Sequence, residues 1–263
     1  MISNHKKQLI PWLIVGTVVT CAGVAFAWPK IAQQKAERTA DSLQATAPIP
    51  VEVAASSTQP ASTPAETTAA APAPLPTELN ISVPFTTQAP TANWDAEHEQ
   101  LCEEASALMV GRHFAGRAIT DAADAEAGMQ TLVDWENQNL GTMESTTAEQ
   151  TAATVRAVYG LAVELKQNPT VDDLKQALAD GKLIMVPAAG QKLKNPYFTA
   201  PGPLYHMLVV KGYTKAGNIV TNDPGTRHGA DYVYDSTVFM NAIGDWNNGD
   251  PANGKKVVLV VSE

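Results

Sequence analysis

The segment formed by residues 38–78 restricts most strongly what this chain can fold into. It consists mainly of Ala, Pro, Thr and Ser and contains few large apolar side chains. Such a segment cannot bury enough apolar surface to offset the conformational entropy lost on folding, so we expect it to be disordered. Proline keeps such a chain extended, with a reach on the order of 100 Å in a polyproline II conformation. We therefore predict a tethering linker over residues 31–78 and place the folded part in residues 79–263.

An apolar run precedes this linker. Residues 9–28 carry no charge, and a run of this length is long enough for a helix to cross a hydrocarbon layer of about 30 Å. Lys6 and Lys7 before the run favour a cytoplasmic N-terminus, with the rest of the chain outside. The run ends in Ala-Phe-Ala, which resembles a signal-peptidase site. Cys21 suggests a lipoprotein, although the residues before it form a poor lipobox.

All three interpretations of the run export the C-terminal part of the chain. We therefore predict that residues 1–30 are a signal peptide or an N-terminal transmembrane anchor, and the length of the run favours the anchor. The expected location is extracytoplasmic. The protein is either held at the cell membrane by its N-terminal segment or secreted after that segment is cleaved.

The charge balance of residues 79–263 excludes several classes of function. This part contains 13 Lys plus Arg and 22 Asp plus Glu, and it therefore carries the whole net charge of −9. The sequence has no basic patch and no glycine-rich phosphate loop, which argues against nucleic-acid and nucleotide binding. It also has no His-Glu-x-x-His motif and no paired cysteine spacing, so we expect neither a metal site nor a cofactor.

Secondary-structure patterns change along residues 79–263. Apolar residues at helical spacing dominate the first half, whereas short runs of β-branched residues dominate the second half. The predicted helices begin at Cys102 and cover 121–140, 147–159, 170–180 and 236–246. The predicted strands cover 81–86, 182–188, 206–213, 218–222, 231–235 and 255–261. Helices followed by strands predict an α+β fold, in which a helical layer packs on a largely antiparallel sheet.

Cys102 is the only cysteine of residues 79–263, so this part cannot form an internal disulfide. A free cysteine is often a small buried core residue, but an unpaired thiol in an exported protein requires an explanation. Its position at a helix start favours the thiolate, because the unpaired N–H groups and the helix dipole lower the pKa of the thiol. Glu103 and Glu104 suit a first helical turn, yet their charge opposes the thiolate if they face the sulfur. A cationic partner must therefore supply most of the activation.

His206 is the strongest candidate for that partner. It begins an apolar strand, and Asp223 ends the next strand 17 residues later. Two antiparallel strands joined by a short hairpin bring such residues side by side, and a nucleophilic cysteine needs a histidine oriented by a third group. The other histidines are weaker candidates: His113 lies eleven residues down the helix, roughly 16 Å from Cys102, and His228 lies in a polar turn. His98 is close to Cys102 in sequence only.

Attack on a carbonyl group also requires donors for the developing oxyanion. The backbone N–H of Cys102 is one such donor. Gln88 follows a predicted strand, and Gln100 stands two residues before the cysteine, so both offer a side-chain amide. Gln88 is preferred because the neighbouring strand end delivers it, whereas Gln100 lies too close in sequence to reach easily over the sulfur. Five aromatic residues are candidates for the lining of a cleft: Trp94, Tyr197, Phe198, Tyr205 and Trp246.

Four blocks of sequence resemble one family. "VPFTTQAPTANWD", "CEEASALM", "GPLYHMLVVKGY" and "TNDPG" resemble, in this order and spacing, the papain-like bacterial cysteine peptidases related to the double-glycine-leader (bacteriocin-processing) peptidases. The similarity covers residues 81–261 and is greatest to the stand-alone secreted branch of the family. Two departures stand out. The usual Cys-Gly pair is Cys-Glu here, and the loop between Gln88 and Cys102 is longer than in the leader peptidases.

The resemblance implies a papain-like α+β fold with the nucleophile at the start of a central helix. By their positions in the motifs, Cys102 is the nucleophile, His206 the general base and Asp223 the orienting residue, and Gln88 helps to form the oxyanion hole. We therefore expect an extracytoplasmic cysteine peptidase that is monomeric and acts on a peptide or protein substrate. The alternatives are a cell-wall peptide amidase with the same triad and a catalytically inactive module that binds peptides or wall material.

Overall fold

The computed structural model describes residues 74–263, and this part of the chain forms helices on both faces of an antiparallel sheet. The helices are α2 (Cys102–Phe114), α3 (Ala122–Asn139), α4 (Ala148–Tyr159), α5 (Val171–Ala179), α6 (Gly190–Leu193) and α7 (Ser236–Ala242), with short 3-10 turns η1 (His98–Gln100) and η2 (Pro251–Asn253). The strands are β1 (Leu79–Asn80), β2 (Ala162–Gln167), β3 (Leu183–Ala189), β4 (Tyr205–Tyr213), β5 (Ile219–Asn222), β6 (Tyr232–Tyr234) and β7 (Val257–Ser262). The predicted α+β fold is confirmed.

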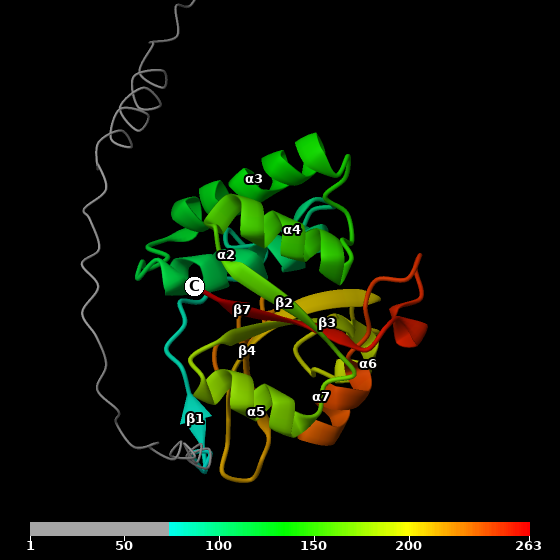
Figure 1. The fold of residues 1–263 in the computed structure, drawn as a ribbon. Helices are drawn as coiled ribbons and strands as arrows, with labels where there is room; N and C mark the ends of the chain where they lie inside the picture. Colours follow the sequence, from blue (N-terminus) through cyan, green and yellow to red (C-terminus); the bar gives the residue numbers. More distant parts are fainter. Residues whose placement is uncertain (1–73) are drawn as a thin grey trace, which may run out of the picture. The chain divides into compact units, whose positions relative to one another are not determined.

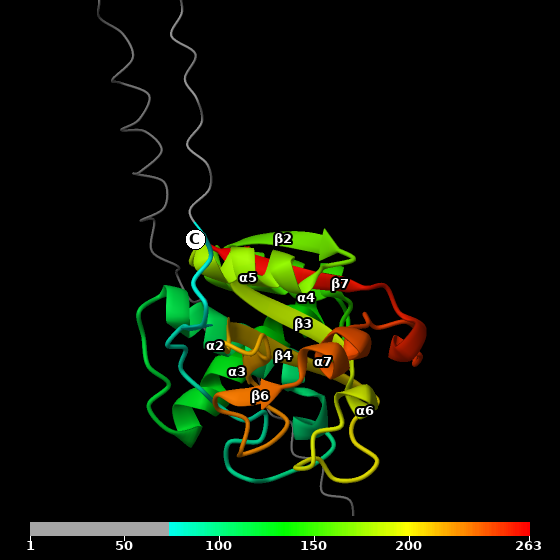
Figure 2. The same cartoon turned by 90° about the horizontal axis from the view of Figure 1, so that it is seen from below.

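The strands follow the order β2-β7-β3-β4-β5-β6, with β1 beside β4, and every pairing is antiparallel. Along each central strand, alternate side chains enter two separate cores. One core lies under α2, α3 and α4, and the other lies under α5, α6 and α7 (Figure 1 and Figure 2). We expected one helical layer, and the second layer explains why β3 and β4 are apolar without alternation: both of their faces are buried.

Helix ends agree with the sequence pattern where a side chain caps them. Thr147 and Thr170 each begin a helix with a capping box, and Asp121 caps the start of α3. Gly160 ends α4 in a left-handed conformation at φ 70°, which suits glycine. These local signals fix α3, α4 and α5 to within one residue of the predicted bounds.

Two predicted elements are wrong in extent. The strand expected at 81–86 does not form, and the nearest strand, β1, covers Leu79–Asn80 just before it. A side chain, rather than the backbone hydrogen bonds of a sheet, holds the segment after β1. Asn222 Nδ2 donates to the carbonyls of Val83 and Pro84 at 3.2 and 3.3 Å. The helix expected at 236–246 ends at Ala242. The chain leaves the helix there, because the Gly244 N–H donates to the carbonyl of Pro187 in β3 at 3.0 Å.

Strand β2 was not predicted from the sequence; it pairs with β7 along its full length at the sheet edge. Its residues are mostly exposed or half-buried, so they lack the apolar run that marks the inner strands. Within residues 74–263, none of the helices combines the length and the apolar character that crossing a membrane requires. The predicted signal peptide or anchor at 1–30 and most of the predicted linker at 31–78 lie outside the described residues.

Candidate active site

Cys102 is the first residue of α2, and its side chain is only 4% exposed. The helix packs Ala105 and Leu108 into the core, as their spacing predicts. Ser106 Oγ donates to the Met207 carbonyl at 3.2 Å and fixes the first turn of α2 against the start of β4. The N–H groups of a first helical turn have no partner inside the helix, so the Cys102 N–H is free to bind a ligand.

The β4–β5 hairpin brings His206 to Asp223. Strands β4 and β5 pair with Val209 opposite Asn222, so His206 near the start of β4 lies close to Asp223 just after β5. His206 Nε2 lies 2.7 Å from Asp223 Oδ1, and both side chains are buried. The predicted proximity of these two residues is therefore present in the structure.

Asp223 lies in a buried network of donors. Its Oδ2 accepts from the Tyr234 hydroxyl at 2.5 Å and from Asn195 Nδ2 at 3.1 Å, and its Oδ1 also accepts from the Gly225 N–H at 2.9 Å. Burial alone raises the pKa of Asp223, but the charge of His206 and the hydrogen bonds of these donors outweigh burial and lower it. Asp223 is therefore a fixed carboxylate that holds His206 by its Nε2 nitrogen.

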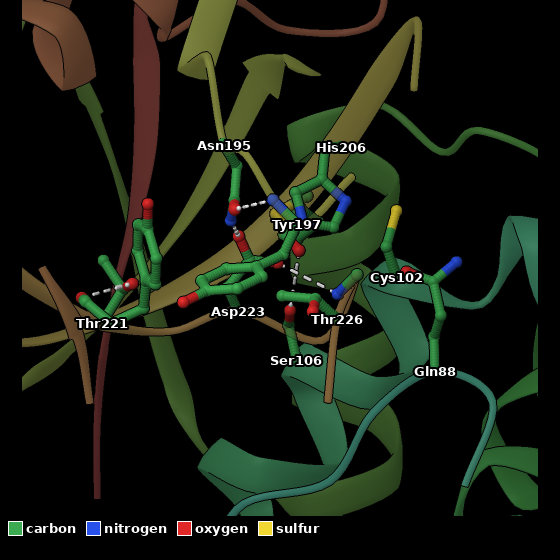
Figure 3. A network of polar contacts seen from close by, with 12 residues as sticks. Gln88, Cys102, Ser106, Asn195, Tyr197, His206, Thr221, Asp223 and Thr226 are labelled. Carbon is green, nitrogen blue, oxygen red and sulfur yellow. Dashed lines mark hydrogen bonds and ion pairs between the residues drawn. The ribbon is translucent and has the colours of Figure 1, made fainter. Parts of the chain in front are cut away.

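The second ring nitrogen of His206 faces the sulfur of Cys102. Because Nε2 is bound to Asp223, Nδ1 is the nitrogen that remains for another partner. Figure 3 shows the ring turned with this nitrogen toward the Cys102 side chain, which projects from the start of α2. No hydrogen bond joins the two side chains in this structure, so the pair faces each other without direct contact.

Aromatic and glycine residues hold the ring of His206 in this orientation. The edge of the Phe198 ring packs against the His206 ring, with centroids 5.3 Å apart. A Cβ atom on Gly225 would lie 2.9 Å from His206 Cε1, closer than real Cβ atoms approach. Only glycine at this position leaves the ring its observed place.

Gln88 lies beside the cysteine. Its backbone N–H donates to the Pro224 carbonyl at 3.0 Å, and its side-chain Nε2 donates to the His98 carbonyl at 2.8 Å. Figure 3 shows the side chain extending toward Cys102. An amide nitrogen carries two hydrogens, so one N–H of Gln88 remains for a ligand. Gln100 lies in η1, where its backbone N–H donates to the Glu97 carbonyl at 2.9 Å.

Glu103 faces the sulfur rather than solvent. Cys102 Sγ donates to Glu103 Oε2 at 2.8 Å, and Glu103 Oε1 accepts from the Thr146 N–H at 2.9 Å. Burial is the main reason why the pKa of Glu103 rises to about 7. Burial, followed by the charge and hydrogen bond of Glu103, also raises the pKa of the Cys102 thiol well above its usual value, and the Met207 backbone opposes this only in part. The surroundings of the sulfur thus favour a thiol when Glu103 is charged.

A second buried acid lies between α2 and α3. Glu104 and Glu136 are both buried, and burial is the main reason why their pKa values are raised. The pKa of Glu104 is raised well above its usual value. Neither carboxyl oxygen of Glu104 has a hydrogen-bond partner among residues 74–263. The neighbouring Glu136 raises the pKa of Glu104 further, because two buried carboxyl groups close together do not both give up their protons readily.

This acid pair makes the stability of the fold depend on pH. A carboxyl group whose pKa is higher in the folded state stabilises fully below its unfolded pKa, and this stabilisation is lost as the pH rises through the folded pKa. Each pKa unit corresponds to about 1.4 kcal/mol, or about 3–6 °C in Tm for a domain of this size. We therefore expect Tm to fall as the pH rises above about 4.5, where these groups titrate in the unfolded chain, and to fall less in Glu104→Gln. Calorimetry of both proteins tests this; equal slopes would contradict it.

The other histidines and aromatic residues named from the sequence have separate partners. His98 sits between Asp95 and Glu126, with its ring nitrogens 2.7 and 3.1 Å from their carboxylates. His113 bonds to the Ser82 carbonyl, and exposed His228 stacks on Tyr197. Of the five aromatic candidates, Phe198 contacts His206, Tyr205 packs on Trp246, and Trp94 and Tyr197 are exposed.

Asn195 and Tyr234, which bond to Asp223 and to each other, were not predicted from the sequence. Tyr234 lies in a correctly predicted strand, but nothing in the chain marks its hydroxyl as a partner of the carboxylate. The structure brings together Cys102, His206, Asp223 and Gln88, and their catalytic roles stay predictions.

Comparisons with known proteins identify a family for this chain. The Peptidase_C39-like family profile matches residues 80–250. A protein from Bacillus anthracis described as a C39-like peptidase has 13% identity and a TM-score of 0.48, with 71% of this chain and 98% of that chain covered. A prointerpain A fragment from Prevotella intermedia has 14% identity and a TM-score of 0.46, with 71% and 72% covered. No curated protein matches the sequence.

The family assignment rests on the profile match, which spans more than half of the chain and includes all four predicted site residues. It confirms the relation to papain-like bacterial cysteine peptidases that the motifs suggested. The chain belongs to the Peptidase_C39-like family and is a cysteine-type peptidase.

Proposed function

We propose that this protein is an extracytoplasmic peptidase that hydrolyses peptide bonds with a Cys102–His206–Asp223 triad and with Gln88 as an oxyanion donor. The observation that carries the proposal is the buried 2.7 Å contact between His206 Nε2 and Asp223 Oδ1. This contact fixes the ring so that Nδ1 is turned to the only cysteine among the described residues (Figure 3). Such a nucleophile, base and orienting acid are the parts that covalent acyl transfer requires.

In this mechanism His206 Nδ1 takes the thiol proton of Cys102, and the thiolate attacks the carbonyl carbon of the substrate. Asp223 stabilises the imidazolium that forms and keeps the ring in the required tautomer. The oxyanion then accepts hydrogen bonds from the backbone N–H of Cys102 and from the free side-chain N–H of Gln88. His206 returns the proton to the leaving amine, and water subsequently releases the acyl group from sulfur.

The extracytoplasmic part of the proposal is supported by the uncharged run at residues 9–28 and the lysines before it. Both the anchored and the cleaved form place residues 79–263 on the same side of the membrane. Protease added to intact protoplasts tests this location, because it should digest the catalytic part only if that part lies outside. Survival of that part in intact protoplasts, with digestion after lysis, would contradict the location.

The hydrolytic activity is tested by incubating the full chain with a peptide library and with a peptidoglycan digest, beside Cys102→Ala. Cleavage of library peptides by the unsubstituted protein, but not by Cys102→Ala, supports the proposal. Cleavage confined to the wall peptides would favour the amidase alternative. Equal product from both proteins would exclude Cys102 as the nucleophile.

Gln88 offers a further prediction. Removing one oxyanion donor typically lowers kcat by about 10²–10³-fold, because the lost hydrogen bond is stronger in the transition state than in the bound substrate. We therefore expect Gln88→Ala to reduce kcat by about this factor with little change in KM, measured on a peptide from the library. Gln100→Ala is the matched control and should stay within about threefold of the unsubstituted protein. A larger loss in Gln100→Ala than in Gln88→Ala would reverse the assignment.

A further inference from the structure

The carboxyl group of Glu103 is held between the nucleophile and a polar loop. One oxygen accepts from Cys102 Sγ at 2.8 Å, and the other accepts from the Thr146 N–H at 2.9 Å and from the Thr146 hydroxyl at 3.4 Å. Thr146 is itself fixed, since its hydroxyl lies 2.8 Å from that of Thr151 and its carbonyl accepts from the Tyr205 hydroxyl at 2.9 Å. The orientation of Glu103 toward the sulfur is thus built into the fold.

No cation compensates this carboxyl group. None of the ion pairs within residues 74–263 involves Glu103, and its side chain is buried. The titratable groups around Cys102 and Glu103 are Glu104 on the same helix, Glu136 on α3, Tyr205 and His206 on β4, and Asp245 after α7. All of these except His206 are acids, so a charged Glu103 would be costly here and would oppose a neighbouring thiolate.

We propose that Glu103 is a positioning residue that sets the pH range in which Cys102 is a thiolate. As a carboxylate it accepts the Sγ–H bond and retains the thiol. As a neutral acid it donates its O–H to the thiolate sulfur. This inference rests on the proposed function, because it concerns the thiolate that His206 generates.

The protons of this step balance without another reactant. The proton of Cys102 moves to His206 Nδ1, and the proton bound by Glu103 remains on Glu103 in a hydrogen bond to sulfur. The reactive form therefore holds one more proton than the resting form, in which Glu103 is charged. Proton uptake by Glu103 and formation of the thiolate are consequently linked, and each favours the other.

The pKa values place this linkage near neutrality. Burial raises the pKa of Glu103 to about 7, so the neutral acid predominates below that pH and the carboxylate above it. The reactive ion pair should therefore be favoured below about pH 7 and become less populated as the pH rises. This is the opposite of a simple thiol, whose reactivity increases with pH.

The test measures alkylation of Cys102 by iodoacetamide in the full chain and in Glu103→Gln. Mass spectrometry of the peptide that contains Cys102 separates its modification from that of Cys21. A glutamine amide donates to the sulfur at every pH, so we expect Glu103→Gln to react at least about tenfold faster than the unsubstituted protein at about pH 8. At about pH 5.5, where Glu103 is itself neutral, the two rates should agree within about threefold.

Glu104→Gln is the matched control, since it makes the same change one residue later, away from the sulfur. Burial raises the pKa of its carboxyl group well above the usual value, which favours the neutral form, so its replacement should alter neither rate by more than about threefold. A rate ratio for Glu103→Gln that is the same at both pH values, or equal to that of Glu104→Gln, would overturn the inference. His206→Ala distinguishes failure of this inference from failure of the proposed function. If Cys102 is alkylated at the same rate in His206→Ala as in the unsubstituted protein, the proposed triad is wrong.

A second measurement avoids the risk that Glu103→Gln does not fold. Methyl methanethiosulfonate caps Cys102 as a methyl disulfide and removes the Sγ–H donor, which lowers the pKa of Glu103 in the free protein. Carbon-13 NMR of the carboxyl group should then show the pKa of Glu103 rising by at least about half a unit on capping. An unchanged titration would overturn the inference.

Discussion

Replacing His206 by alanine is expected to lower kcat/KM by on the order of 10⁴-fold or more, because in the proposed mechanism both proton transfers pass through its ring. The ring is buried, held by Asp223 at 2.7 Å and by the edge of Phe198, and its free nitrogen faces the cysteine. Alanine leaves the sulfur next to Glu103 with no base. Hydrolysis of a library peptide measures the effect under conditions in which chemistry limits the rate.

His113→Ala is the control for this change. His113 lies in the last turn of α2, where it bonds to the Ser82 carbonyl at 2.9 Å, so its removal should leave kcat/KM within about threefold. A fall of less than about tenfold in His206→Ala would show that another group serves as the base.

Asp223→Ala should damage both activity and stability. It removes the acceptor of His206, Tyr234, Asn195 and the Gly225 N–H, and these buried donors are then left unpaired. Breaking such a buried charged pair costs about 3–5 kcal/mol of folding free energy, and loss of the oriented ring should lower kcat by on the order of 10⁴-fold. Calorimetry and peptide hydrolysis measure the two effects separately.

Asp223→Asn is the matched control, because its amide oxygen still accepts from His206 and from the Gly225 N–H. Its amide nitrogen can donate to the Tyr234 hydroxyl but opposes the Asn195 donor, and Cys-His-Asn sets occur in papain-like proteases, so we expect a smaller loss of kcat than in Asp223→Ala. Equal losses for Asp223→Asn and Asp223→Ala would indicate that the charge, rather than the orientation of the ring, carries the effect.

The sequence predicts those parts of the fold that depend on local patterns. Capping residues such as Thr147 and Thr170 place helix ends because their side chains satisfy N–H groups nearby in the chain. The pairing of His206 with Asp223 was predictable for a similar reason, since a short hairpin leaves few possible arrangements. The four motif blocks together predicted the family.

Features that depend on distant contacts were not predictable in the same way. The strand expected at 81–86 fails because Asn222 binds its carbonyls, and Asn222 is more than 130 residues away in sequence. Tyr234 and Asn195 reach Asp223 only after β6 and the loop before β4 have folded together. Glu103 resembled an ordinary helix-start residue, and its contact with the sulfur depends on a rotamer fixed by Thr146.

The most direct test of the Cys102–His206 pair is the rate at which a thiol-directed label modifies Cys102 across the pH range, in the unsubstituted protein and in His206→Ala. A pair that exchanges a proton predicts rapid labelling well below the ordinary thiol pKa of about 8.5, and loss of that labelling in His206→Ala. Labelling that rises only near or above about pH 8.5, and is the same in both proteins, would contradict the triad.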